Sequence, residues 1–307
     1  MYYIRSIALL VGLGVLGLVW GNNLYACDVC GCSATGQFRG LLKEVPDNQI
    51  GINCYQSVFE TTHPPNLFGE PAHETTRETF RFVNVNANYR IGHRFSLQAQ
   101  VPFGFFKQTG YNTRQSGLGD VVLSVNYFAL DELIGASANS IIVIAGAGIK
   151  LPTGKNDALQ NDETLNPNLQ LGTGSTDFLF FTQSTLRLGS SGFNAEMSYR
   201  INTENEHDYQ FGNMFNVAAR YFYNIQGDKF SHTPYLGVAY EHSQQNTSFG
   251  DRLSITGGYL LLLEAGYEFW LGNINCGISF MAPVRQELSD GLVANKAQFS
   301  TKLTYFF

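Results

Sequence analysis

The chain has 307 residues, a formal charge of −6, 14% charged residues, 14% aromatic residues and a mean hydropathy of −0.09. This mean hydropathy excludes a bundle of apolar membrane helices. The net negative charge argues against a nucleic-acid partner, because nucleic acids bind basic protein surfaces. Low charge with many aromatic residues is typical of a membrane β-barrel, in which apolar lipid-facing residues alternate with polar lumen residues.

Residues 1–26 are predicted to be a secretory signal peptide. Arg5 lies in a short leading segment, Ile7–Trp20 is apolar, and Ala26 provides a small residue before the cleavage point. The apolar stretch is shorter than a helix that spans a bilayer comfortably. An uncleaved membrane anchor is the alternative.

Residues 27–48 form a predicted periplasmic tail that begins with Cys27, Cys30 and Cys32. Thiolates at this spacing could hold a soft metal such as Cu(I) or Zn(II), the one cofactor that the sequence suggests. Two of these cysteines could instead form a disulfide in an oxidising compartment. Cys27 could also carry a lipid, because Leu24-Tyr25-Ala26 before it roughly matches a lipoprotein cleavage box. The sequence leaves these alternatives open.

Residues 49–307 are predicted to form an all-β, antiparallel, up-and-down transmembrane barrel. The segment divides into about twelve amphipathic strands, an even number as bacterial barrels require. The predicted strands are 49–62, 74–90, 94–107, 117–130, 138–151, 174–188, 192–202, 210–225, 231–244, 256–270, 273–283 and 296–307.

Period-two alternation supports these strands. In one of them, Phe95, Leu97 and Ala99 alternate with polar residues. Short connections alternate with long ones, as expected for periplasmic turns and outer loops. Because lipid cannot satisfy the backbone groups of an open sheet edge, the last strand must pair with the first. A secreted soluble β-protein is the alternative, but it does not require a signal peptide, low charge and long strands together.

Charged residues on the strands are expected to face the lumen. A basic residue facing lipid at mid-depth costs about 2–4 kcal/mol. These charges could form a structural network or a polar constriction, and we expect the barrel to stay folded when Arg200, Arg220 or Lys302 is replaced by Leu. The lumen-lining candidates are Glu78, Arg90, Arg94, Asp120, Lys150, Glu196, Arg200, Arg220, Glu264, Glu268 and Lys302.

Four motifs occur in order along the barrel: Tyr89-Arg90-Ile91-Gly92-His93-Arg94-Phe95, Ser116-Gly117-Leu118-Gly119-Asp120-Val121, Gly148-Ile149-Lys150-Leu151-Pro152-Thr153-Gly154-Lys155 and Leu169-Gln170-Leu171-Gly172-Thr173-Gly174-Ser175-Thr176-Asp177. From about Gln49 to the C-terminus, the chain resembles the outer-membrane transporters grouped as the phenol meta-pathway degradation family. The resemblance implies a β-barrel that admits small, often hydrophobic compounds. The glycines and prolines of these motifs could contact a ligand, or could shape strand entry and loop geometry.

The sequence therefore predicts an outer-membrane channel of a Gram-negative bacterium for passive passage of small molecules, and not an enzyme. The expected partners are outer-membrane lipid, small solutes and the barrel-insertion machinery, whose signal the aromatic C-terminal strand ending at Phe307 resembles. No nucleic-acid partner is expected. One alternative is a barrel that displays a metal-binding or structural cysteine tail. A barrel hydrolase using His207-Asp208 in an outer loop is another.

Overall fold

The computed structural model describes residues 48–62, 75–109, 113–134, 139–160, 163–164, 167–227 and 230–307. The predicted signal peptide and the three tail cysteines lie outside these residues, so the alternatives for the tail stay predictions. Within the described ranges, no helix is long and apolar enough to cross a membrane.

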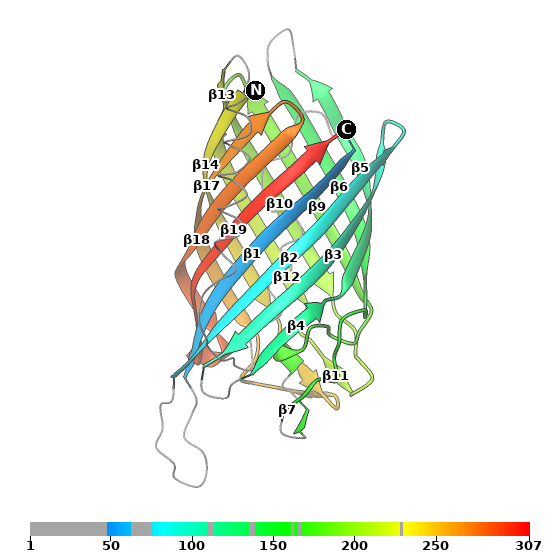
Figure 1. Cartoon of the computed structure of the whole chain (residues 1–307), viewed down its shortest axis with the longest axis vertical. Helices are drawn as coiled ribbons and strands as arrows, with labels where there is room; N and C mark the ends of the chain where they lie inside the picture. Colours follow the sequence, from blue (N-terminus) through cyan, green and yellow to red (C-terminus); the bar gives the residue numbers. More distant parts are fainter. Residues whose placement is uncertain are drawn as a thin grey trace, which may run out of the picture.

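The described residues form one closed antiparallel barrel (Figure 1). Apart from the short β4 and β13, the fourteen-stranded sheet consists of twelve long strands, as predicted. Each pairs with its neighbours along the chain, and β1 pairs with β19 to close the barrel. The long strands are β1 Gln49–Thr62, β2 Thr75–Ile91, β3 Phe95–Gln108, β5 Val121–Leu133, β6 Ser140–Leu151, β9 Asp177–Leu188, β10 Ser191–Ile201, β12 Met214–Tyr223, β14 Phe230–Ser243, β17 Gly258–Leu271, β18 Ile274–Leu288 and β19 Val293–Phe306.

Shorter elements lie mostly in the connections. The long connections carry small β-pairs and single 3-10 turns at the rim opposite the C-terminus, which is the lower rim in Figure 1. These elements are β7 Leu159–Gln160, β8 Glu163–Thr164, η2 Pro167–Leu169, β11 Tyr209–Gln210, β15 Thr247–Ser248, β16 Asp251–Arg252 and η3 Ser289–Gly291. β4 Arg114–Leu118 instead pairs with β3 in the wall, and β13 Ile225–Gln226 pairs with β14 at the upper rim, where the C-terminus lies (Figure 1).

The predicted strand 117–130 is wrong at its start. β4 ends at Leu118 and β5 begins at Val121, so Gly119 and Asp120 leave the sheet. The ladder of β3 with β5 stops at Gln100, and its ladder with β4 starts at Phe103. Pro102 lies in the gap and has no N–H to donate, while its carbonyl accepts a hydrogen bond from the Gly119 amide at 2.8 Å. The interruption frees Asp120 to turn into the barrel.

The two faces of the wall differ as an outer-membrane barrel requires. Outward positions carry exposed Leu, Ile, Val, Phe and Tyr, and inward positions are mostly buried and often polar. The first residue of β1 pairs with Phe306 beside the C-terminus, so this rim carries the chain end and the short turns. Such a rim faces the periplasm in bacterial barrels, and the long loops face outward.

The loss of stability caused by a charge on the outward face should depend on how deep in the membrane the substituted residue lies. Leu97 is the third residue of β3 and lies near the short-turn rim, whereas Leu263 lies in the middle of β17 and is 54% exposed. We expect Leu263→Arg to lower the free energy of unfolding by about 2–4 kcal/mol, and Leu97→Arg to have a smaller effect. Leu133→Arg, at the rim end of β5, is the control and should cost about 0–1 kcal/mol. Urea unfolding in lipid vesicles measures the series, and equal losses at all three positions would contradict this orientation.

Candidate functional site

Asp120 lies at the break in the wall between β4 and β5, and its side chain contacts the long connection between β6 and β9. The residue is 7% exposed. Its Oδ1 accepts a hydrogen bond from the Gly154 amide at 3.0 Å, and its Oδ2 accepts one from the Thr173 amide at 2.9 Å. The Thr173 hydroxyl adds a third at 3.0 Å. One carboxylate therefore holds both ends of the connection between β6 and β9, whose described residues 152–160, 163–164 and 167–176 we call the lumen loop.

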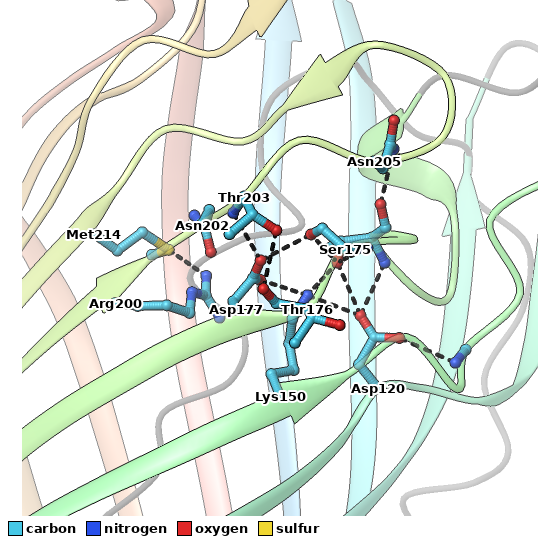
Figure 2. Close-up of polar contacts among 12 residues, drawn as sticks. Asp120, Lys150, Ser175, Thr176, Asp177, Arg200, Asn202, Thr203, Asn205 and Met214 are labelled. Atoms are coloured by element: carbon cyan, nitrogen blue, oxygen red, sulfur yellow. Dashed lines mark hydrogen bonds and ion pairs between the residues drawn. The ribbon is translucent and has the colours of Figure 1, made fainter.

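Lys150, at the end of β6, lies between two carboxylates (Figure 2). Its Nζ is 2.9 Å from Oδ2 of Asp120 and 2.6 Å from Oδ2 of Asp177, and it also donates to the Thr173 hydroxyl. The three charged side chains are at most 6% exposed. Burying a charge is costly unless it is paired and hydrogen-bonded, and this arrangement meets both conditions. We call Asp120, Lys150 and Asp177 the ion cluster.

The ion cluster also holds the connection between β10 and β12. Oδ1 of Asp177 accepts hydrogen bonds from the Ser175 hydroxyl at 2.8 Å and from the Thr203 amide at 3.0 Å. The Asn205 side chain donates to the Thr173 carbonyl at 2.8 Å (Figure 2). Two outer loops are thus fastened to the same three buried charges.

Glycines let the lumen loop approach this cluster. A Cβ on Gly172 would lie 2.4 Å from the Gly154 carbonyl oxygen and 2.6 Å from Oδ1 of Asp120. A Cβ on Gly117 would lie 3.0 Å from the side chain of Leu171. The motif glycines therefore shape the loop, which favours the geometric alternative over direct ligand contact.

The lumen loop has an apolar face that packs against the barrel wall. Ala158 and Leu169 are buried, and Leu171 packs beside them. Their partners are inward aromatic residues of β1, β2 and β3: Tyr55, Phe59, Phe80, Phe82 and Phe106. Phe80 and Phe106 meet edge to face with ring centroids 5.1 Å apart. The loop therefore covers part of the lumen near the outer rim.

A second group of charges lies inside the barrel, closer to the periplasmic rim. Arg220 is 2% exposed; its Nε lies 2.6 Å from Glu264 and its Nη2 lies 2.8 Å from Glu196. The Asn194 side chain accepts a further hydrogen bond from Nη1 at 3.1 Å. Because two carboxylates would lose their cation, we expect a barrel in which Arg220 is replaced by Leu to stay folded with a lower free energy of unfolding.

The remaining charged candidates occupy several environments. Lys302 contacts Glu268 at 2.5 Å, and Glu268 is 1% exposed. Arg90, near the periplasmic rim, pairs with Asp131 at 3.0 Å. Glu78 is fully buried and accepts hydrogen bonds from two threonine hydroxyls. Arg200 donates to the Met214 sulfur (Figure 2). That these groups contact a passing solute stays a prediction.

Arg94 does not lie where alternation placed it. The residue belongs to the turn 92–94 between β2 and β3, and it is exposed. Its Nη1 donates to the hydroxyl of Tyr127, which faces outward, at 3.2 Å. Alternation fails here because a turn does not keep the side-chain period of a strand.

Other chemistry is sparse in the described part of the chain. No group of three His, Cys, Asp or Glu side chains there is placed to hold a metal ion. Cys54 and Cys276 are free and half-buried. His207 lies in an exposed turn, 3.8 Å from Glu206.

Comparison of the sequence with known protein families finds one that matches most of the barrel. Residues 59–261 match the family described as "Putative MetA-pathway of phenol degradation". The chain belongs to this family. All three charges of the ion cluster lie within the matched segment. No curated protein matches the chain in sequence.

A solved structure shows the same fold. The COG4313 outer-membrane channel of Pseudomonas putida F1 superposes with a TM-score of 0.65 at 15% identity, over 89% of this chain and 98% of that one. The β domain of the Bordetella autotransporter BrkA gives a TM-score of 0.49 at 10% identity, over 85% of this chain and all of that one. This family member is therefore an outer-membrane β-barrel of the Gram-negative type.

Asp177 is a member of the ion cluster that the sequence pattern indicates but that we did not predict. Asp177 lies in the fourth motif but was not among the lumen candidates. It shares the period-two face of β9 with Gln183 and Thr185, which are both buried. Reading that period back to the strand start would have placed Asp177 inward, beside Lys150.

Proposed function

We propose that this family member is a passive outer-membrane channel for small molecules, with apolar and aromatic compounds among its solutes. The observation that carries the proposal is the lumen loop. It covers part of the lumen, yet buried polar contacts at its two ends hold it to the wall. A loop fixed over part of the lumen sets the width of the path that remains beside it.

The distribution of side chains in the lumen supports the same proposal. Near the outer rim part of the inward face is apolar, where the aromatic cluster of β1, β2 and β3 lies under the lumen loop. A second cluster lies on the adjoining part of the wall, formed by β12, β14, β17 and β18, and comprises Ala218, Ala239, Leu260, Leu262 and Met281. Closer to the periplasm the face carries Arg220, Glu264, Glu268 and several buried amides. A solute with an aromatic body and a polar group would meet a matching surface in each half.

The names of similar proteins agree with this proposal. The structural relative from Pseudomonas putida is called an outer-membrane channel, and the family description refers to phenol degradation. The channel function and the link to aromatic compounds are therefore part of the proposal for this chain.

Single-channel recording in planar bilayers tests the proposal. We expect stable conductance steps, and we expect phenol and related aromatic solutes to reduce the open-state current in a concentration-dependent way. Glucose at the same concentration is the control solute. Absence of any conductance from correctly folded protein would contradict the channel. Conductance with no effect of aromatic solutes would contradict the solute class.

A further inference from the structure

Four basic side chains gather on the outward face of the barrel, at the outer ends of β2, β3 and β4. Arg77 and Arg81 belong to β2, Lys107 belongs to β3 and Arg114 belongs to β4. On β2 and β3 they alternate with buried lumen residues, so they point away from the lumen. Arg114 pairs directly with Lys107 and therefore shares its face. We call these four residues the basic patch.

The strand register gathers the patch around one hydroxyl group. Thr79 lies between Arg77 and Arg81 on the outward face of β2, and directly opposite Lys107. Directly opposite side chains in a sheet begin about 4.5–5.5 Å apart, and alternate residues of one strand lie about 7 Å apart. Three cations therefore surround Thr79. Lys107 also lies directly opposite Arg114, and two like charges in this position destabilise a sheet. An anion bound between them would remove that cost.

Paired strands, rather than a loop, hold the patch in place. Nε of Arg81 donates to the side-chain oxygen of Gln56 on β1 at 2.7 Å. The backbone N–H of Arg77 donates to the Thr109 hydroxyl at 2.5 Å, and the Thr109 N–H donates to the Arg77 carbonyl at 3.3 Å. These bonds continue the contact between β2 and β3 beyond its last paired residues. The spacing of the cations is therefore fixed by the fold.

One carboxylate lies beside the patch, on β1. Glu60 is directly opposite Arg77 in the register, and its Oε2 lies 2.7 Å from Nζ of Lys296 on β19. The pair of Glu60 and Lys296 is neutral as a whole. It therefore leaves the net charge of the basic patch unchanged.

The patch lies where the apolar band of the outer surface ends, at the lower rim in Figure 1. The outward residues of β3 are apolar from Phe95 to Phe105, and Lys107 follows them. With a rise of about 3.3 Å per residue and a tilt of about 40°, Lys107 lies about 30 Å from Phe95 along the membrane normal. The apolar band of outer-membrane barrels is about 25 Å tall. The cations are therefore at the level of the lipid headgroups of the outer leaflet.

We infer that the basic patch binds the phosphorylated headgroup of an outer-leaflet glycolipid. A phosphate monoester carries about −1.5 to −2 charges near neutral pH, so two phosphates on one headgroup match four cations. Arginine can donate two parallel hydrogen bonds to phosphate oxygens, and lysine acts as a point charge. The Thr79 hydroxyl can donate to the same phosphate. This site is independent of the proposed channel function.

Apolar side chains next to the patch favour a lipid over a free phosphate ion. Phe103, Phe105 and Leu118 are exposed on the outward face, on the membrane side of the patch. Leu118 pairs with Phe103, so these side chains form one surface. The acyl chains of a lipid held by its phosphates would lie along this surface. Burial of apolar area would then add to the affinity, which a free phosphate ion cannot achieve.

Native mass spectrometry of the full-length protein in detergent tests the site, with bisphosphorylated lipid A as the probe. Arg77→Gln/Lys107→Gln removes two of the cations around Thr79 and leaves the bond between Arg81 and Gln56 in place. We expect this variant to bind lipid A about thirtyfold more weakly, because each Lys or Arg near a membrane surface contributes about a factor of five in affinity. Lys107→Arg keeps the charge and should bind like the wild type.

Arg252→Gln/Arg285→Gln is the matched control. It removes two exposed cations from β16 and β18, on the outer side of the barrel but outside the patch. Its affinity for lipid A should stay close to that of the wild type. Lipid A that carries a single phosphate should bind more weakly to the wild type. Inorganic phosphate at the same concentration as lipid A should not displace it.

Each result either supports or overturns the site. Equal lipid A binding by the wild type and by Arg77→Gln/Lys107→Gln would overturn it. Equal weakening in Arg252→Gln/Arg285→Gln would overturn it too, because the attraction would then depend on the overall charge of the outer surface. Displacement by inorganic phosphate would show that the ligand is a free anion rather than a lipid. Loss of binding in Lys107→Arg would contradict recognition through charge.

Discussion

Replacement of Lys150 by Met is expected to release the lumen loop. The variant leaves Asp120 and Asp177 buried side by side without their shared cation. Removing one partner from a buried ion pair costs about 3–5 kcal/mol, because the remaining charge keeps its desolvation penalty. The two carboxylates would also repel each other across the loop ends. We therefore expect a lower free energy of unfolding in urea, together with a larger and noisier single-channel conductance.

Lys155→Met is the matched control for this prediction. Lys155 lies on the same loop, but its side chain is 60% exposed and its contact with Asp157 is 3.7 Å. Exposed ion pairs contribute little to stability. The control removes the same kind of charge from the loop that the ion cluster anchors, so it should leave both stability and conductance close to those of the wild type. If Lys150→Met behaved like Lys155→Met, the ion cluster would not anchor the loop.

Replacement of Arg220 by Met should have an effect of similar size on stability. The guanidinium contacts Glu264 and Glu196, and Arg220 and Glu264 are each 2% exposed. We expect a loss of about 3–5 kcal/mol in the free energy of unfolding, since Glu264 would remain charged in a buried site. Urea unfolding in lipid vesicles measures the loss.

The double variant Arg220→Met/Glu264→Met separates loss of charge pairing from loss of packing. Replacing both members of a buried pair with apolar residues of similar volume is often neutral or stabilising. The double variant should therefore recover most of the stability lost in Arg220→Met. If it were less stable than the single variant, the packing of these side chains would matter more than the buried charges.

Local patterns were sufficient to predict most of the wall. Strand spacing, period-two alternation and the need to close every edge in lipid gave twelve strands, with most boundaries within a few residues of those observed. The same alternation indicated that Lys150, Arg220, Glu264 and Glu268 point inward, since each lies within a regular strand. It failed at Arg94, which a turn removes from the period, and at residues 117–120, where Pro102 interrupts the neighbouring ladder.

The sequence by itself determined that this chain forms a closed membrane barrel, because alternation and low charge depend on neighbouring residues and on the lipid around them. Only the tertiary structure decided which charges meet. Asp120, Lys150 and Asp177 come from three separate segments, and a strand register and a folded loop are needed to bring their oxygens within 3 Å of one nitrogen. The interruption of the ladder between β18 and β19 after Met281↔Gln298 likewise depends on how these two strands pair, because each of them stays paired with its other neighbour at that level.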